Sequence, residues 1–182
     1  MFKVEQPVTT DGLDARFSVN TIAPYLLTKR LLPLLKSESR VINVSSAAQA
    51  SVDLNALQGE MQLDDMAAYS QSKLALTSWT RSMAEGALKS GNRESPLFVS
   101  VNPGSLLGTK MVKEGFGQDG RDISIGADIL ARAALSDEFS QANGLYYDND
   151  SGQFGQPHPD ALDAAKNKLL CDSIESVLAN NT

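Results

Sequence analysis

The sequence has a single cysteine, Cys171, and a single histidine, His158, among its 182 residues. One cysteine cannot form an internal disulfide bond, which fits a protein of the reducing cytoplasm. Structural zinc sites usually take four cysteine or histidine ligands, so the composition argues against a zinc centre. We therefore expect a cytoplasmic location and no metal site.

Long apolar runs and an excess of positive charge are also missing. No apolar stretch approaches the roughly 20 residues of a membrane span, and the first residues, MFKVEQPVTT, lack the apolar core of a signal peptide. Lys and Arg number 16 against 22 Asp and Glu, which gives a formal net charge of −6. This charge argues against nucleic acid or an anionic membrane as the main partner. An apolar content of 42% is typical of a globular chain, here a single domain over residues 1–182.

Helical and strand-like segments alternate along the chain. The patterns predict helices over 10–35, 65–89, 125–135 and 161–178, strands over 40–46, 97–101 and 144–147, and loops over 47–66 and 105–122. Thr10 is the expected N-cap of the first helix, and Pro24 should kink it because proline has no N–H to donate. Such alternation with long connections predicts a parallel sheet covered by helices.

Ligands of open parallel sheets bind at the carboxyl ends of the strands. Ser46 and the Pro103–Gly104 turn both follow predicted strands, so we expect the functional site there. Tyr69 and Lys73 lie four residues apart on one face of the helix over 65–89. A nearby ammonium favours the phenolate and could lower the tyrosine pKa from its ordinary value near 10. Taken alone, this spacing is weak, because aromatic and basic residues align by chance on many surface helices.

Several motifs together resemble the short-chain dehydrogenase/reductase family. They are VINVSS (41–46), YSQSKLALTSWTRSMA (69–84), VNPGSLLGT (101–109) and, upstream, FSVNTIAPYLLTKRLLPLL (17–35). The resemblance covers nearly the whole chain. The long separation between Ser46 and Tyr69 is similar to that of the retinol-dehydrogenase-like and WW-domain-oxidoreductase-like branch, where an insertion precedes the tyrosine.

The resemblance implies a catalytic tetrad of Asn20, Ser46, Tyr69 and Lys73. Tyr69 would exchange a proton with the oxygen of a carbonyl or alcohol substrate, a small molecule. Ser46, the second serine of its pair, would hydrogen-bond that oxygen. Lys73 would lower the pKa of Tyr69 and bind the nicotinamide ribose, and Asn20 would position a water that links Lys73 to solvent.

The resemblance also implies a nicotinamide cofactor, NAD or NADP, which supplies the hydride. Its expected contacts are Tyr69, Lys73, Pro103, Gly104 and Thr109. However, the sequence holds no glycine-rich turn between a strand and a helix, the usual cradle of a dinucleotide pyrophosphate. We therefore expect a partial Rossmann-like, doubly wound fold of three αβα layers, with a parallel sheet that lacks its first strands. The chain would begin just after the fourth strand of the family.

Two functions follow from this sequence. The chain is either an NAD(P)-dependent oxidoreductase whose first half lies elsewhere, or a truncated and inactive remnant that serves as an interaction module. In either case the helices over 10–35 and 65–89 are the expected homo-oligomer contact, and the strand at 41–45 is an unpaired edge. The sequence identifies neither the substrate nor the choice between NAD and NADP.

Overall fold

Four strands form one sheet, in the order β1-β2-β3-β4, in the computed structural model of the chain, which describes residues 1–89, 91 and 95–180. The strands are β1 (Arg40–Val44), β2 (Leu97–Asn102), β3 (Tyr146–Asp148) and β4 (Gln153–Gly155). The first three are parallel, as the sequence predicted, and β4 runs antiparallel to β3. The apolar run of β2 is buried because this strand has a partner on each side and helices on both faces.

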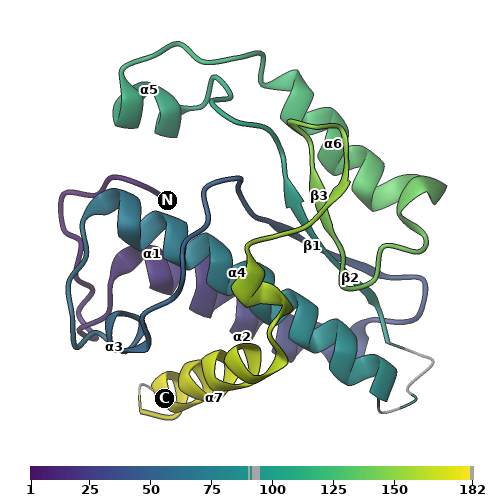
Figure 1. Cartoon of the computed structure of the whole chain (residues 1–182), viewed down its shortest axis with the longest axis horizontal. Coiled ribbons are helices and arrows are strands. Elements are labelled where there is room, and N and C mark those ends of the chain that lie inside the picture. The colour runs from purple at the N-terminus through teal and green to yellow at the C-terminus, as the bar shows by residue number, and fades with distance from the viewer. Residues whose placement is uncertain (90, 92–94, 181–182) are drawn as a thin grey trace.

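Helices cover both faces of the sheet and make the expected three layers (Figure 1). On one face, α6 (Ser124–Leu135) packs Ile129 and Ala133 against Val99 and Val101 of β2. On the other face lies α4 (Asp65–Lys89), the helix of the predicted Tyr-Lys pair. Beyond α4 lie α2 (Ala23–Leu31) and α7 (Ala164–Asn180), which share a core with it. The partial Rossmann-like α/β fold is confirmed.

The first predicted helix begins later than expected, at Ala15, and is not a regular α-helix throughout. It consists of α1 (Ala15–Phe17), a π-helical turn (Ser18–Ile22), α2 and a 3₁₀ turn (Leu32–Leu34). Thr10 is not the N-cap; Asp14 is, and its side chain accepts the N–H of Arg16. Pro24 lies in the first turn of α2, directly after the π-helical turn, where its missing N–H disturbs the helix least.

Both long connections contain helices that sequence patterns did not indicate. The 47–66 segment includes α3 (Leu54–Leu57), capped by Asp53. The 105–122 segment includes α5 (Lys110–Phe116), which begins at the N-cap Thr109 and ends at Gly117 in a left-handed conformation. Two further 3₁₀ turns lie at Asp137–Phe139 and Pro159–Leu162. None of the helices that the structure describes combines the length and apolar character needed to cross a membrane.

Helix α7 packs on the helix pair that was expected to form an oligomer contact. Trp79 of α4 is fully buried, and the ring of Tyr25 from α2 meets it edge-on at 5.6 Å between centroids. Leu170 and Ile174 of α7 belong to the same core. The Trp79 side of the pair is therefore internal packing. The opposite side of the first helix stays exposed at Leu27, Leu31 and Leu34, and the homo-oligomer stays a prediction.

Replacement of Trp79 tests the packing between α4 and the helices α2 and α7. Nε1 of Trp79 has no hydrogen-bond partner among the described residues, so the side chain stabilises the fold by packing alone. We expect Trp79→Ala to lower the free energy of unfolding by about 3–5 kcal/mol. Leu88→Ala on the same helix is the control, because Leu88 is 70% exposed. Urea denaturation followed by circular dichroism measures both, and an equal effect of the two changes would contradict the packing described.

Candidate active site

Helix α4 is fixed in register with β1 by polar side chains that face the strand. Asn43 Nδ2 donates to Thr80 Oγ1 at 2.8 Å, and the hydroxyls of Ser45 and Thr77 lie 2.7 Å apart. All four residues are buried, where an unpaired polar group would cost about 1–3 kcal/mol. These contacts therefore favour one axial position of α4 against the sheet.

The same register brings Ser46 to Tyr69. Ser45 turns toward α4, and Ser46, which lies beyond the end of β1, borders a cavity together with Tyr69. There the hydroxyl of Ser46 lies close enough to the phenol of Tyr69 to favour its ionised form and lower its pKa. The N–H of Ala48 donates to Ser46 Oγ at 3.1 Å, which leaves the serine proton free to point at the phenol oxygen. The structure thus places the second serine of the pair beside the tyrosine.

Lys73 lies one helical turn after Tyr69, and its Nζ is 5.8 Å from the centroid of the tyrosine ring. The ammonium donates to the backbone carbonyl of Val44 at 2.7 Å. Burial lowers the pKa of Lys73 to about 8, because the charged form loses water. At neutral pH the lysine is therefore still mostly a cation.

The pKa of Tyr69 differs from the expectation. Burial raises it above the ordinary value of a tyrosine, and the hydrogen bond from Ser46 offsets only part of that rise. The expected lowering by Lys73 is therefore wrong for the free protein, where the ammonium is directed at Val44. A neutral phenol next to a cation is the state of the site at neutral pH, and this state can donate a proton.

These residues border a cavity of about 590 Å³ at the carboxyl ends of β1 and β2. Ser46, Tyr69 and Lys73 lie on its lining together with three predicted cofactor contacts, Pro103, Gly104 and Thr109. The remaining lining is largely apolar and includes Phe2, Met66, Leu106, Leu107, Met111, Val112 and Phe116. The size and the apolar lining with a few polar groups are typical of a small-molecule site.

The Pro103–Gly104 turn has a shape that only glycine adopts readily, since Gly104 has a φ of +123°. Asn102 Oδ1 accepts the N–H of Gly104 at 3.2 Å, and Asn149 Nδ2 donates to the carbonyl of Pro103 at 2.9 Å. Thr109 accepts the N–H of Val112 at the start of α5, and its hydroxyl proton remains available for a ligand.

Phe2 is a site residue that the sequence did not indicate. Its ring meets Tyr69 edge-on at 5.5 Å and stacks on Phe116 at 5.1 Å between centroids. Helix α5 approaches Phe2 so closely that a Cβ on Gly115 would lie 2.6 Å from the ring. Phe2 and Tyr69 lie far apart in the chain, so no local pattern could have revealed the contact.

Asn20, the fourth predicted catalytic residue, is buried but is not part of the cavity lining that holds the other three. Its Nδ2 donates to Ser72 Oγ at 3.0 Å and to the carbonyl of Met1 at 2.9 Å, and its Oδ1 accepts the amino group of Met1. Asn20 therefore contacts the helix of Tyr69 and Lys73 through Ser72. Its link to Lys73 through a water stays a prediction, as do the catalytic roles of the tetrad.

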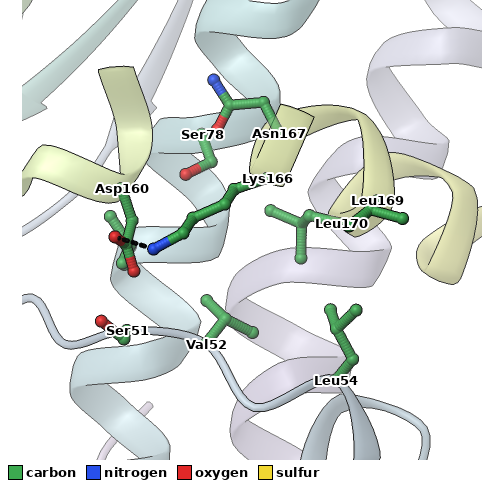
Figure 2. A pocket seen from close by; sticks show the side chains of 10 residues that line it. Ser51, Val52, Leu54, Ser78, Asp160, Lys166, Asn167, Leu169 and Leu170 are labelled. Carbon is green, nitrogen blue, oxygen red and sulfur yellow. Dashed lines mark hydrogen bonds and ion pairs between the residues drawn. The ribbon is translucent and has the colours of Figure 1, made fainter. Parts of the chain in front are cut away.

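A second cavity, of about 230 Å³, lies between the 51–54 segment, α4 and α7 (Figure 2). The ion pair of Lys166 and Asp160 lies on one side of it, and leucines such as Leu54 and Leu170 lie on the other. Its lining, all within the described part of the chain, includes none of the predicted site residues. The larger cavity is therefore the candidate active site.

The two serines are expected to respond differently to substitution. Ser45→Ala removes a buried hydroxyl that contacts Thr77, so the free energy of unfolding should fall by about 1 kcal/mol. Ser46→Ala removes a half-buried hydroxyl at the cavity and should change stability by less than about 0.5 kcal/mol. Urea denaturation measures both changes. A larger loss for Ser46→Ala would mean that Ser46 is chiefly a structural residue.

Comparison with known proteins agrees with this geometry. A sequence model of the family described as short chain dehydrogenase matches residues 3–119. Mouse retinol dehydrogenase 12 is 30% identical over 152 residues, which span 76% of this chain and 46% of that protein. Mouse retinol dehydrogenase 13 is 40% identical over 98 residues, 51% of this chain and 29% of that protein. The chain thus spans about half the length, or less, of these curated relatives.

Solved structures show the same fold. An uncharacterized protein from Mycobacterium Paratuberculosis superposes with a TM-score of 0.75 at 24% identity, over 97% of this chain and 63% of its own. The landomycin C-6 ketoreductase LanV, solved with NADP and rabelomycin, gives a TM-score of 0.56 at 24% identity, over 82% of this chain and 56% of its own. With the family match across the site residues 20–109, we conclude that the chain belongs to the short-chain dehydrogenase/reductase family and resembles its retinol dehydrogenases.

Proposed function

We propose that this chain carries the proton-transfer part of an NAD(P)-dependent oxidoreductase site that interconverts a carbonyl and an alcohol. The observation that supports this most is the contact of Ser46 with Tyr69 at the edge of a cavity, with Lys73 one turn away. A hydroxyl pair of this kind can hold one substrate oxygen from two sides. Both residues border the cavity, where a substrate oxygen could reach them.

The residues present fit the nicotinamide end of the cofactor. Lys73 and Tyr69 offer donors for a ribose, Gly104 allows a flat ring to approach the backbone, and the Thr109 hydroxyl can meet a carboxamide. When bound, the cofactor would donate or accept the hydride. For the pyrophosphate the sequence offers no glycine-rich turn, so we expect this chain by itself to bind NAD or NADP weakly.

Residues of this chain would donate and accept the proton of the reaction. In the reducing direction, the neutral phenol of Tyr69 would donate its proton to the carbonyl oxygen as negative charge develops there. Ser46 would hold the same oxygen by a hydrogen bond, which stabilises that charge. The Lys73 cation would then stabilise the tyrosinate left behind, an interaction strengthened by the partly dry surroundings of both groups.

The apolar lining of the cavity supports an apolar alcohol or aldehyde as the substrate. Phe2, Met111 and Phe116 offer surface to a hydrocarbon body, whereas the polar groups gather around Tyr69. The names of the curated relatives, among them retinol dehydrogenases and a human polyprenol dehydrogenase, agree with this class. The alternative, an inactive interaction module, is less well supported, because it does not explain why Ser46, Tyr69 and Lys73 line one cavity.

Replacement of Tyr69 tests the proposal. We expect the purified chain, at millimolar NADH or NADPH, to reduce apolar aldehydes, with cofactor oxidation followed by absorbance. Tyr69→Phe should reduce turnover by at least about 100-fold, the usual contribution of a general acid. Tyr147→Phe is the matched control, since Tyr147 is buried on the far side of the sheet with α6. Turnover by Tyr69→Phe at the original rate, or none by the unaltered chain, would contradict the proposal.

A further inference from the structure

The backbone carbonyl of Ser46 accepts two side-chain hydrogen bonds from other parts of the chain. Gln49 Nε2 donates to it at 2.9 Å, and the hydroxyl of Tyr146, at the start of β3, donates at 3.1 Å. Tyr146 is 6% exposed, so the second bond lies out of water. A carbonyl oxygen has two lone pairs, and both are used here.

Gln49 is itself held by the C-terminal part of the chain. Its Oε1 accepts the N–H of His158 at 3.0 Å, so the amide cannot turn over without losing a bond at each end. His158 in turn caps the 3₁₀ turn Pro159–Leu162, where its Nδ1 accepts the N–H of Asp160 at 3.2 Å. A continuous path of hydrogen bonds thus leads from this turn to the backbone of Ser46.

Ser46 needs such support because the sheet no longer holds it. The N–H of Ser45 donates to the carbonyl of Val101 at 2.8 Å, and the ladder of β1 with β2 ends there. Beyond that point the orientation of the next peptide plane is set by other contacts. That orientation decides where Ser46 Oγ lies relative to the phenol of Tyr69.

We propose that Gln49 and Tyr146 are positioning residues that hold the Ser46 hydroxyl against Tyr69. They act through the carbonyl of Ser46. This inference rests on the proposed function, in which that hydroxyl and the phenol share the substrate oxygen. It assigns a role in the site to the 146–158 segment, which lies outside the sequence motifs around Ser46, Tyr69 and Pro103.

The test measures the pKa of Tyr69 in the free protein. The chain is labelled with 3-fluorotyrosine, whose more acidic phenol titrates at lower pH, and the ¹⁹F resonance of Tyr69 is assigned by its loss in Tyr69→Phe. We expect Ser46→Ala to raise the pKa of Tyr69 by about one pH unit, since a donated hydrogen bond is lost. Tyr146→Phe and Gln49→Met should each raise it by at least about half as much.

Matched controls remove the same kinds of hydrogen bond elsewhere. Tyr25→Phe removes a phenol that bonds Glu175, and Gln58→Met removes an amide that bonds Ser173 Oγ at 2.6 Å. Both should lower thermal stability about as much as the test variants and leave the pKa of Tyr69 unchanged. If Gln49 and Tyr146 had a purely structural role, Gln49→Met and Tyr146→Phe would likewise lower thermal stability without changing the pKa of Tyr69.

Unchanged titration of Tyr69 in Gln49→Met and Tyr146→Phe would overturn the inference, and so would an unchanged titration in Ser46→Ala. Gln49 is half-buried in a loop, so Gln49→Met keeps the test decisive if Tyr146→Phe does not fold. The measurement needs neither cofactor nor turnover. A chain without reductase activity would therefore contradict the proposed function and still allow the positioning of Ser46 to be judged.

Discussion

The position of helix α4 along strand β1 is the constraint on which the site depends. Lys73, Thr77 and Thr80 follow one another on one face of α4 and reach the backbone or side chains of successive residues at the end of β1. A shift of α4 by one residue would rotate Tyr69 by about 100° around the helix axis and separate it from Ser46. The same buried contacts that stabilise the layer therefore also bring the phenol to the serine.

A buried ion pair supports the beginning of α4 in the same way. Arg16, 1% exposed, bonds Asp14 at the N-cap of α1 and Asp65 in the first turn of α4. Such a buried cation stabilises a fold only when its partners stay in place, because an unpaired charge there would be costly. Arg16 thus joins the start of the first helix to the helix that carries Tyr69.

The sequence motifs located the strand ends and the helix of the site, because strand ends and helix faces follow from local patterns. The resemblance of these motifs to the short-chain dehydrogenase/reductase family then assigned Ser46, Tyr69, Lys73 and Gly104 to one site. Phe2 and α5 could not be assigned to it, since their places depend on a contact between segments far apart in the chain. The short exposed strand β4 has no apolar alternation to reveal it.

The direction of the Tyr69 pKa also lay beyond the sequence. Spacing shows that Lys73 can approach the phenol, but it does not show how much water either group loses. In the fold, loss of water acts on both groups in opposite directions: it raises the pKa of Tyr69 and lowers that of Lys73. The two pKa values therefore move apart, so that at neutral pH the phenol of Tyr69 keeps its proton while Lys73 remains a cation.

The titration of Lys73 tests most directly whether the cation is buried beside Tyr69 in this register. NMR of the chain labelled with ¹³C-lysine, with Lys73 assigned by its loss in Lys73→Met, gives the pKa of each ammonium. The account predicts that Lys73 titrates near pH 8, with the cation present below that pH. A Lys73 that titrates with the exposed lysines, near about 10.4, would show that it lies in water and that the site is not assembled as described.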